Sequence, residues 1–320
     1  MAYKTFPHKS RHASAKPLAQ FLRVVDHIHE ALSSETPTTK RDIYYKDVAL
    51  FGSQSVVDRL IDDIAATMDV PRADLFVRAS AKGLFCGSSL VMHLHGGDTV
   101  RGSDSEGLLI PPSEDIRRFE VDERLSWVLV VEKEAVFQTL CHLQFSRHPA
   151  LPGPGLLITG KGYPDVATRQ LVASLGQNLD SRIPILAVVD ADPFGIDILS
   201  VYKYGSNNMS HQGDLDTPRL RWAGVMFSEL ASLGIEKDTL IPITKHDEKK
   251  AFSMLKRAHT PKKWRKEIQL MIYTRRKAEI EVLSASQDGH ANVQTMTYLP
   301  TSAGGIFSVY KGGGSEGTDG

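Results

Sequence analysis

Apolar residues in the first part of the chain follow a helical spacing. In residues 17–33, "PLAQFLRVVDHIHEALS", apolar side chains recur every three or four positions, which predicts a helix. The same spacing predicts a helix over residues 53–68, with Ser53 as its N-cap. Between them, "TKRDIYYKDVALFG" (39–52) indicates a third, short helix that begins near Thr38 or Thr39. The N-terminal part is therefore expected to be mainly helical.

Two short runs with alternating apolar residues follow these helices. "DLFVRAS" (74–80) and "SLVMHLH" (89–95) lie around Gly83 and Gly87 and predict the two strands of a hairpin. Helices followed by a β-hairpin are the order of a winged helix-turn-helix domain, in which the second helix can enter a DNA major groove. Pro111 and Pro112, with the polar "SEDIRRFE" behind them, indicate a linker or domain boundary.

Beyond that boundary the pattern changes to apolar strands that alternate with helices. The strands are predicted at "WVLVVE" (127–132), "GLLITG" (155–160) and "IPILAVVDAD" (183–192), and each precedes a helical pattern. Such alternation predicts a mainly parallel sheet covered on both faces. The sequence therefore predicts an α/β protein with a winged-helix domain over 1–115, an α/β domain over 116–310 and a disordered Gly-rich tail over 311–320.

Composition narrows the class of protein. A length of 320 residues suits about two domains. The two cysteines exclude a disulfide scaffold and paired-cysteine zinc sites. Without a long apolar run or the apolar core of a signal peptide, we expect an intracellular protein with no membrane partner. The net charge of zero argues against nucleic acid, but the strongly cationic run 245–277 keeps a DNA-binding surface possible.

Three acidic residues follow the predicted strands of the α/β domain. Glu132 ends the first strand, and Asp190 and Asp192 end the third, where period-two geometry points both aspartates to one side if both still belong to the strand. Ligands of a parallel sheet bind at the carboxyl ends of its strands. Gathered carboxylates repel each other, and a hard divalent cation relieves that repulsion. The pattern predicts a site for Mg²⁺, which needs few carboxylates.

Other candidate motifs are weaker. "GPGLLITGKG" nearly spells a phosphate-binding loop, but position 162 is Gly instead of Ser or Thr, and "LLIT" is typical of a strand interior, so ATP binding is rejected. Lys161 is kept as a candidate contact to a DNA phosphate. His93 and His95 alternate on a predicted strand without a supporting carboxylate or thiol pattern, and surface positions are expected for them.

The adjacent residues Tyr44 and Tyr45 have two interpretations. Neighbouring tyrosines are usually structural, with one ring packed inward and the other at the surface. Phenol groups flanked by the fixed charges of "TKRDIYYKD" can instead supply a nucleophile. Composition and spacing leave both interpretations open.

Five blocks in order resemble the topoisomerase VI A-subunit family over residues 15–285. These are "TTKRDIYYKDVALFGSQ", "VVEKEAVFQTL", "LLITGKGYPDVATRQLV", "VVDADPFGIDIL" and "RKAEIEVL". They are most similar to the eukaryotic meiotic branch, whose transesterase makes the double-strand breaks that initiate recombination. The resemblance implies a winged-helix (CAP-like) domain with a nucleophilic tyrosine, followed by a Toprim domain with a magnesium site.

Matched position by position, the resemblance assigns the chemistry to particular residues. It implies that Tyr45 is the nucleophile, Tyr44 a packing neighbour and Arg41 the basic residue beside the nucleophile. It assigns the magnesium ligands as Glu132, Asp190 and Asp192. Lys82, in "SAKGL", and the basic run 245–277 are further candidates for contacts to the DNA backbone. The tail after residue 284 shows no clear family pattern.

The resemblance also implies an activity and partners. The expected activity is Mg²⁺-dependent formation of double-strand breaks in meiosis, with a 5′-phosphotyrosyl link between protein and DNA. A homodimer on double-stranded DNA is expected, in which each active site takes its tyrosine from one protomer and its metal from the other. The other expected partners are meiotic accessory proteins and a topoisomerase VI B-type ATPase-like subunit, and the nucleus is the expected compartment. Two alternatives stay open: the A subunit of a true type IIB topoisomerase that reseals DNA, and a catalytically silent DNA-binding scaffold.

Overall fold

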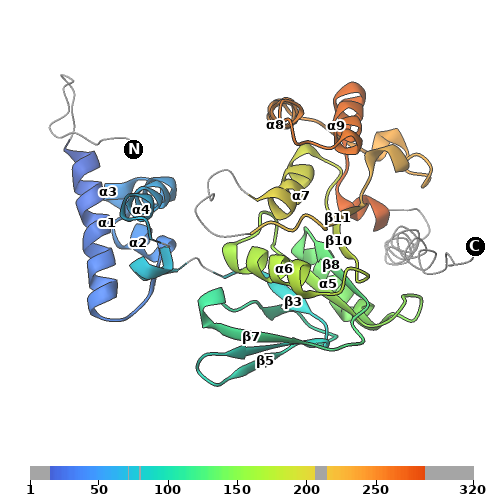
Figure 1. Cartoon of the computed structure of the whole chain (residues 1–320). Coiled ribbons are helices and arrows are strands. Elements are labelled where there is room, and N and C mark those ends of the chain that lie inside the picture. Colours follow the sequence, from blue (N-terminus) through green and yellow to red (C-terminus); the bar gives the residue numbers. More distant parts are fainter. Residues whose placement is uncertain (1–14, 71, 79–80, 206–214, 285–320) are drawn as a thin grey trace, which may run out of the picture. The chain divides into compact units, whose positions relative to one another are not determined.

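The chain folds into two compact units, each with its own hydrophobic core (Figure 1). The computed structural model describes residues 15–70, 72–78, 81–205 and 215–284. The first unit runs to Ala81, and the second begins at Lys82. The predicted Gly-rich tail lies outside the described residues. None of the helices in the described part is both long and apolar enough for a membrane span.

The first unit is helical, as the sequence predicts. Its helices are α1 (Lys16–Ser33), α2 (Lys40–Lys46), α3 (Val48–Phe51) and α4 (Gln54–Met68). A short parallel pair joins β1 (Thr38–Thr39) to β2 (Val77–Arg78). Ser53 occupies the predicted N-cap position of α4, but its hydroxyl contacts that of Ser55 and forms no capping hydrogen bond.

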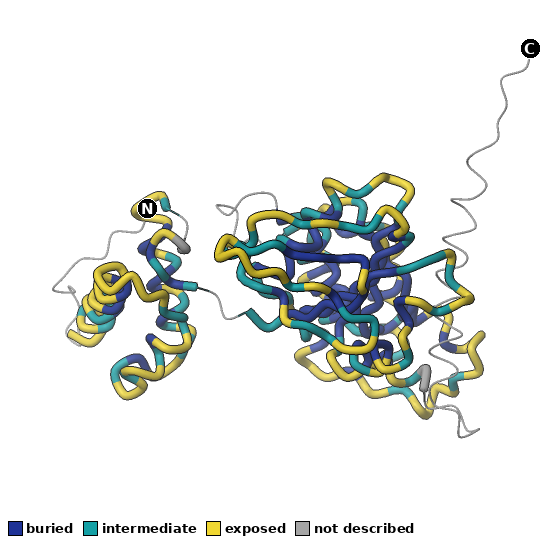
Figure 2. Tube along the Cα trace, turned by 90° about the horizontal axis from the view of Figure 1, so that it is seen from below, coloured by how far each residue is buried: buried dark blue, intermediate teal, exposed yellow. Residues whose placement is uncertain are grey.

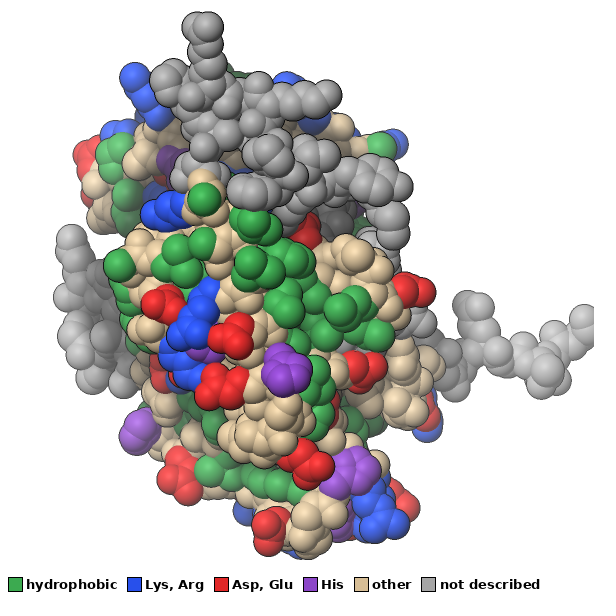
Figure 3. Space-filling view, turned by 90° about the vertical axis from the view of Figure 1, so that its left-hand side faces the viewer, with side chains coloured by type: hydrophobic (Ala, Val, Ile, Leu, Met, Phe, Trp, Pro, Cys, Tyr) green, Lys and Arg blue, Asp and Glu red, His purple; other side chains and the backbone are tan. Residues whose placement is uncertain are grey.

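Helix α1 shows how an apolar helix face packs onto this core. Val24, Ile28 and Ala31 are buried, with Val24 and Ile28 in the cluster that also holds Ile43 of α2. Leu22 and Leu32 remain exposed on the same helix. The view onto the side where α1 lies in Figure 1 shows apolar side chains gathered at the surface (Figure 3). The core of this unit thus takes up only part of the apolar surface of α1.

The second unit is built around a six-stranded, mainly parallel sheet. Its strands, in spatial order, are β11 (Arg221–Gly224), β10 (Ile185–Val188), β8 (Trp127–Val131), β9 (Gly155–Thr159), β3 (Leu84–Cys86) and β6 (Leu108–Leu109). The first four run parallel, and β3 and β6 are antiparallel to their neighbours. Every residue of β8 and β9 is buried, which explains their uninterrupted apolar sequences. Figure 2 shows the buried backbone gathered in the interior of this unit. The prediction of a mainly parallel α/β fold is confirmed.

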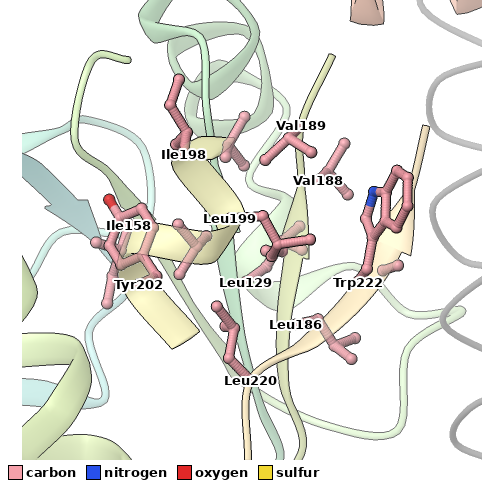
Figure 4. Packing of buried hydrophobic residues seen from close by; sticks show 14 of the residues in the cluster. Leu129, Ile158, Leu186, Val188, Val189, Ile198, Leu199, Tyr202, Leu220 and Trp222 are labelled. Carbon is pink, nitrogen blue, oxygen red and sulfur yellow. The ribbon is translucent and has the colours of Figure 1, made fainter. Parts of the chain in front are cut away.

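Helices connect the parallel strands in sequence. The connecting and following helices are α5 (Glu134–His142), α6 (Val166–Asn178), α7 (Pro193–Tyr204), α8 (Lys245–Leu255) and α9 (Lys262–Thr274). Near α7, the side chains of Leu129, Leu186, Leu199 and Trp222 form part of the buried cluster that joins the helix to the sheet (Figure 4). A small antiparallel pair, β12 (Ile241–Pro242) with β13 (Arg276–Lys277), lies outside the main sheet.

The predicted hairpin of residues 74–80 and 89–95 is wrong. Val77 and Arg78 pair with β1, whereas β4 (Leu90–Leu94) is the central strand between β5 (Thr99–Arg101) and β7 (Ile116–Val121). The stretch "SEDIRRFE", interpreted as a linker, forms most of β7. Alternation shows which side of a strand faces a core but not which strand will pair with it. Residues 82–115, assigned by the sequence to the winged-helix domain, lie in the second unit.

Candidate active-site residues

A capping box fixes the start of the helix that carries the tyrosines. Thr39 adopts an extended backbone, and its hydroxyl accepts a hydrogen bond from the backbone N–H of Asp42 at 3.1 Å. The Asp42 carboxylate in turn accepts from the backbone N–H of Thr39 at 3.1 Å. Both contacts satisfy N–H groups that the first turn of a helix leaves without partners. The sequence "TKRD" therefore sets where α2 begins and how its side chains are directed.

The two tyrosines on this helix have different surroundings. Tyr44 is half-buried and packs against the core of the first unit, next to Ile43. Tyr45 is 64% exposed. Their ring centroids are 5.4 Å apart, with the ring planes inclined by 50°. Only the Tyr45 hydroxyl is carried by a mostly exposed side chain, which suits attack on a large substrate.

Arg41 precedes Tyr45 by one helical turn, so the two side chains lie on the same helix face. The other charged residues around the tyrosines are engaged. Lys40 pairs with Asp62 at 2.9 Å, Lys46 with Glu30 at 3.2 Å, and Asp47 with Arg23 at 2.5 Å. Arg41 is exposed, and the described residues offer it no ion pair. It is thus the cation available beside Tyr45.

The three predicted acids lie at the ends of two neighbouring strands of the second unit. Glu132 follows β8, and Asp190 and Asp192 follow β10, which pairs in parallel with β8. The β10 strand ends at Val188, so neither aspartate belongs to the strand, and the condition for placing both on one side by period-two geometry is not met. Asp192 is instead the N-cap of α7, where its Oδ1 accepts a hydrogen bond from the Gly195 N–H at 2.7 Å. We call these three carboxylates the acidic edge.

Contacts within the acidic edge bring Glu132 and Asp190 together. The backbone N–H of Asp190 donates to Glu132 Oε2 at 2.8 Å. Both side chains are buried, whereas Asp192 is half-buried. No cluster of three metal-binding side chains is already assembled within the described residues. The sequence thus predicted that the three acids share one edge of the sheet. It did not predict that Asp192 caps α7, whereas Glu132 and Asp190 contact each other.

Burial raises the pKa of Glu132, and the nearby charge of Asp190 raises it further. Burial is also the main cause of the raised pKa of Asp190. Two buried carboxylates in one place are costly when both are ionised, and a divalent cation removes that cost. All donors of the acidic edge are carboxylate oxygens, the ligand type preferred by Mg²⁺. The residues present therefore fit a hard divalent cation.

A segment near the end of the described residues holds the acidic edge, and the sequence reasoning missed its role. We call residues 276–282 the C-terminal strap. The Ile280 N–H donates to Asp190 Oδ1 at 2.8 Å, and the Ala278 N–H donates to the Ala191 carbonyl at 3.1 Å. Lys277 Nζ lies 3.4 Å from Asp192 Oδ2. The block "RKAEIEVL" signals the strap in the sequence, but only tertiary contacts show what it touches.

The two candidate DNA-contacting lysines meet in the second unit. Lys82 Nζ donates to the Lys161 carbonyl at 3.2 Å, although 79 positions separate them. Lys161 Nζ pairs with Glu134 at 2.8 Å. Residues 156–159 are strand interior, as the rejection of a phosphate-binding loop requires. These contacts place both lysines next to the β9–α6 connection, whose Gly162 N–H donates to the Glu132 carbonyl at 2.9 Å.

The histidine pair does not form a metal site in the described structure. His93 Nε2 lies 2.8 Å from Glu120 Oε2, so a carboxylate is present that the local sequence pattern did not indicate. Glu120 belongs to β7, the strand paired with β4, and is exposed. His95 is exposed. One histidine and one exposed carboxylate can form an ion pair but provide too few ligands for a metal ion. The exposure of His95 agrees with the expected surface position.

Comparison with known protein families agrees with this arrangement. The family model for the Toprim domain of the topoisomerase 6 A-subunit/Spo11 proteins matches residues 127–302, and the model described as "Type IIB DNA topoisomerase" matches residues 16–77. The first match spans more than half of the chain and includes the whole acidic edge. The chain belongs to the topoisomerase 6 A-subunit/Spo11 family. Its members are type IIB topoisomerase-like transesterases.

Individual relatives show how far the similarity extends. The chain is 38% identical over 291 residues to the "Meiotic recombination protein SPO11" of Mus musculus, which covers 90% of this chain and 71% of the relative. It is 36% identical over 268 residues to "Meiotic recombination protein rec12" of Schizosaccharomyces pombe, and the match covers 83% of this chain and 73% of the relative. The DNA topoisomerase 6 A-subunit of Arabidopsis thaliana is 35% identical over 269 residues, and the match covers 82% of this chain and 61% of the relative. Both branches of the topoisomerase 6 A-subunit/Spo11 family are thus among its relatives.

Proposed function

We propose that this protein forms DNA double-strand breaks in meiosis, with Tyr45 as the nucleophile. The observation that carries the proposal is the different exposure of two adjacent tyrosines in a member of this family: Tyr45 is 64% exposed, while Tyr44 packs on the core. Arg41, on the same helix face, is the exposed cation that a phosphate substrate requires. The SPO11 proteins of Mus musculus and Homo sapiens support the biological role, since they match at 38% identity, against 36% and 35% for two topoisomerase 6 A subunits.

The proposed reaction exchanges one phosphate ester for another. The Tyr45 oxygen attacks the phosphorus of a DNA phosphodiester and loses its proton. The bond from phosphorus to the 3′ oxygen breaks, that oxygen takes up a proton, and a 5′-phosphotyrosyl link forms. Because a phosphodiester replaces a phosphodiester, cleavage needs no ATP. The Arg41 guanidinium has the geometry to bind a phosphate oxygen and to stabilise the charge that develops there.

The acidic edge supplies the ligands for Mg²⁺ in this proposal. Glu132, Asp190 and Asp192 would hold the ion, which supplies charge stabilisation for the phosphate oxygens when bound. The buried carboxylates with raised pKa values support this role, because their arrangement is costly without a cation. Lys82 and Lys161 are proposed contacts to the DNA backbone.

The proposed assembly is a homodimer on double-stranded DNA in the nucleus. Each active site would combine the tyrosine of one protomer with the acidic edge of the other, and two such sites would cut two strands. The proposed partners are meiotic accessory proteins and a topoisomerase VI B-type ATPase-like subunit. The family membership supports this assembly, since topoisomerase VI A subunits work with a B subunit.

The nucleophile is tested by trapping protein attached to 5′ DNA ends in meiotic cells. We expect an adduct with the wild type and with Tyr44→Phe, and none with Tyr45→Phe. The Tyr44→Phe variant is the matched control, because it removes the neighbouring hydroxyl from the same helix. An adduct that survives Tyr45→Phe and disappears in Tyr44→Phe would contradict the proposal and identify Tyr44 as the nucleophile. No adduct with any variant in the presence of the partners would favour the silent scaffold.

The A subunit of a true topoisomerase VI is the second candidate function. The similarity to the Arabidopsis thaliana topoisomerase 6 protein, at 35% identity, favours it. The two functions share the cleavage step and differ in resealing. Relaxation of supercoiled DNA by this chain with ATP and a B-type subunit would establish the topoisomerase. Cleavage without resealing under the same conditions would favour the meiotic function.

A further inference from the structure

Asp190 and Asp192 share a pattern of contacts that extends beyond the acids themselves. In each, Oδ1 accepts a hydrogen bond from a backbone N–H, that of Ile280 for Asp190 and that of Gly195 for Asp192. In each, Oδ2 faces a lysine ammonium group. Lys133 Nζ lies 3.7 Å from Asp190 Oδ2, and Lys277 Nζ lies 3.4 Å from Asp192 Oδ2. The oxygens that the backbone leaves available are therefore the ones that meet lysines.

Each lysine is held in place by further acids outside the acidic edge. Lys133 Nζ lies 3.0 Å from Glu279 and 2.7 Å from Glu281, both on the C-terminal strap. Lys277 Nζ lies 3.0 Å from Asp247 Oδ1, a buried carboxylate in the capping box of α8. These anchors fix both ammonium groups beside the aspartates, so neither lysine swings freely into solvent.

A lysine ammonium group carries a positive charge at neutral pH, since its ordinary pKa is about 10.4. The carboxylates that surround Lys133 and Lys277 stabilise that charge. A fixed positive charge attracts the carboxylates and repels a divalent cation that approaches the same oxygens.

We propose that Lys133 and Lys277 are built-in counter-cations of the acidic edge, which compete with a divalent cation for Asp190 and Asp192 and weaken its binding. The inference rests on the proposed function, because it concerns the same carboxylates. In the absence of metal, the lysines relieve the repulsion among the acids. When metal binds, it must overcome the two ammonium groups. The C-terminal strap thereby sets the metal affinity without supplying a ligand.

The affinity for Mn²⁺, measured with the full chain by electron paramagnetic resonance of the free ion, tests the proposal. Lys277→Met removes the charge and keeps the length of the side chain, and we expect it to tighten Mn²⁺ binding about tenfold. Lys133→Met is expected to act in the same direction. Lys277→Arg keeps the charge and should bind Mn²⁺ like the wild type. Lys237→Met removes a charge from an exposed position and is the matched control for net charge.

Thermal unfolding with and without Mn²⁺ gives a second readout. Lys277→Met should be less stable than the wild type without metal, because Asp192 and the buried Asp247 lose their counter-charge. Added Mn²⁺ should then stabilise the variant more than the wild type. If Lys277→Met fails to fold, Lys133→Met carries the test, since its anchors Glu279 and Glu281 are about half exposed and tolerate the loss.

Unchanged or weaker Mn²⁺ binding in the folded lysine variants would overturn the proposal and make the lysines supports of the site. Asp192→Asn separates this failure from that of the proposed function. If Asp192→Asn loses Mn²⁺ binding while the lysine variants match the wild type, only the competition is wrong. If Asp192→Asn and Asp190→Asn both bind Mn²⁺ like the wild type, the metal site itself is wrong. Absence of binding in the wild type and in both lysine variants would overturn both.

Discussion

Tyr45 and Tyr44 differ because neighbours on a helix point about 100° apart. Ile43 and Tyr44 face the core of the first unit, which leaves Tyr45 at the surface beside Arg41. The same helix therefore combines a packing ring with an exposed phenol. A single residue step along α2 decides which hydroxyl a large substrate such as DNA can reach.

Arg41 provides the prediction at the residue scale. Arg41→Ala should lower the rate of DNA cleavage about a hundredfold, because a positioned charge at the developing negative charge is lost. Arg41→Lys should recover part of the rate, since lysine keeps the charge but not the planar fork. Single-turnover cleavage of a bound oligonucleotide duplex measures the effect. A large loss of DNA affinity with an unchanged cleavage rate of bound DNA would make Arg41 a binding residue only.

At the scale of elements, Asp197 joins three segments of the second unit. Its buried carboxylate on α7 accepts from Tyr163 at 2.6 Å in the β9–α6 connection, and it pairs with Lys250 of α8 at 2.5 Å and with Arg257 at 2.6 Å. Burial alone opposes the charge of Asp197, but these donors outweigh burial and hold its pKa below the ordinary value. The Asp197 carboxylate thus links α8 to α7, in addition to the packing of the two helices.

Asp197→Asn tests this joint through stability. At pH 7 we expect the variant to lose about 3 kcal/mol in the free energy of unfolding, because Lys250 and Arg257 are left without their partner. Since the folded pKa is lowered, the contribution is present above the unfolded value of 3.8 and is lost as the pH falls through the folded pKa. Urea unfolding at several pH values measures the difference.

The matched control for Asp197 is Asp238→Asn, which changes an exposed aspartate in the same unit. It should leave the free energy of unfolding within about 0.5 kcal/mol of the wild type. The free energies of unfolding of Asp197→Asn and the wild type could instead differ by a constant amount down to about pH 3. That result would show that the charge of the Asp197 carboxylate does not stabilise the contact between α7 and α8.

At the scale of the whole molecule, two separate cores predict two unfolding events. The cluster around Ile43, Val57 and Ile61 shares no residue with the cluster around Leu129 and Val188. Ile43→Ala should destabilise only the first unit, and Leu129→Ala only the second, each by about 3 kcal/mol. Calorimetry or hydrogen exchange resolved by segment measures both. A single transition shifted equally by both variants would show that the two units unfold as one.

The sequence by itself determined the local elements and the chemical candidates. Helical spacing predicted α1 and α4, and uninterrupted apolar runs predicted β8, β9 and β10. Burial of one helix face requires apolar residues every three or four positions, and burial of a whole strand requires a continuous apolar run. The same strands put Glu132 and Asp190 at one edge of the sheet. The resemblance of five sequence blocks then selected Tyr45, which periodicity alone had left equal to Tyr44.

Only the tertiary structure decided which distant segments meet. Alternation could not tell that Leu84–Cys86 joins the main sheet, since pairing partners depend on packing over long separations. Nor could it show that Lys277 and Ile280 reach back to Asp192 and Asp190, 85 and 90 residues earlier in the chain. Such contacts follow from the path of the strap beside residues 190–192 and have no local period. They determine the electrostatic setting of the acidic edge, which is why the candidate ligands were readable from the sequence and their counter-cations were not.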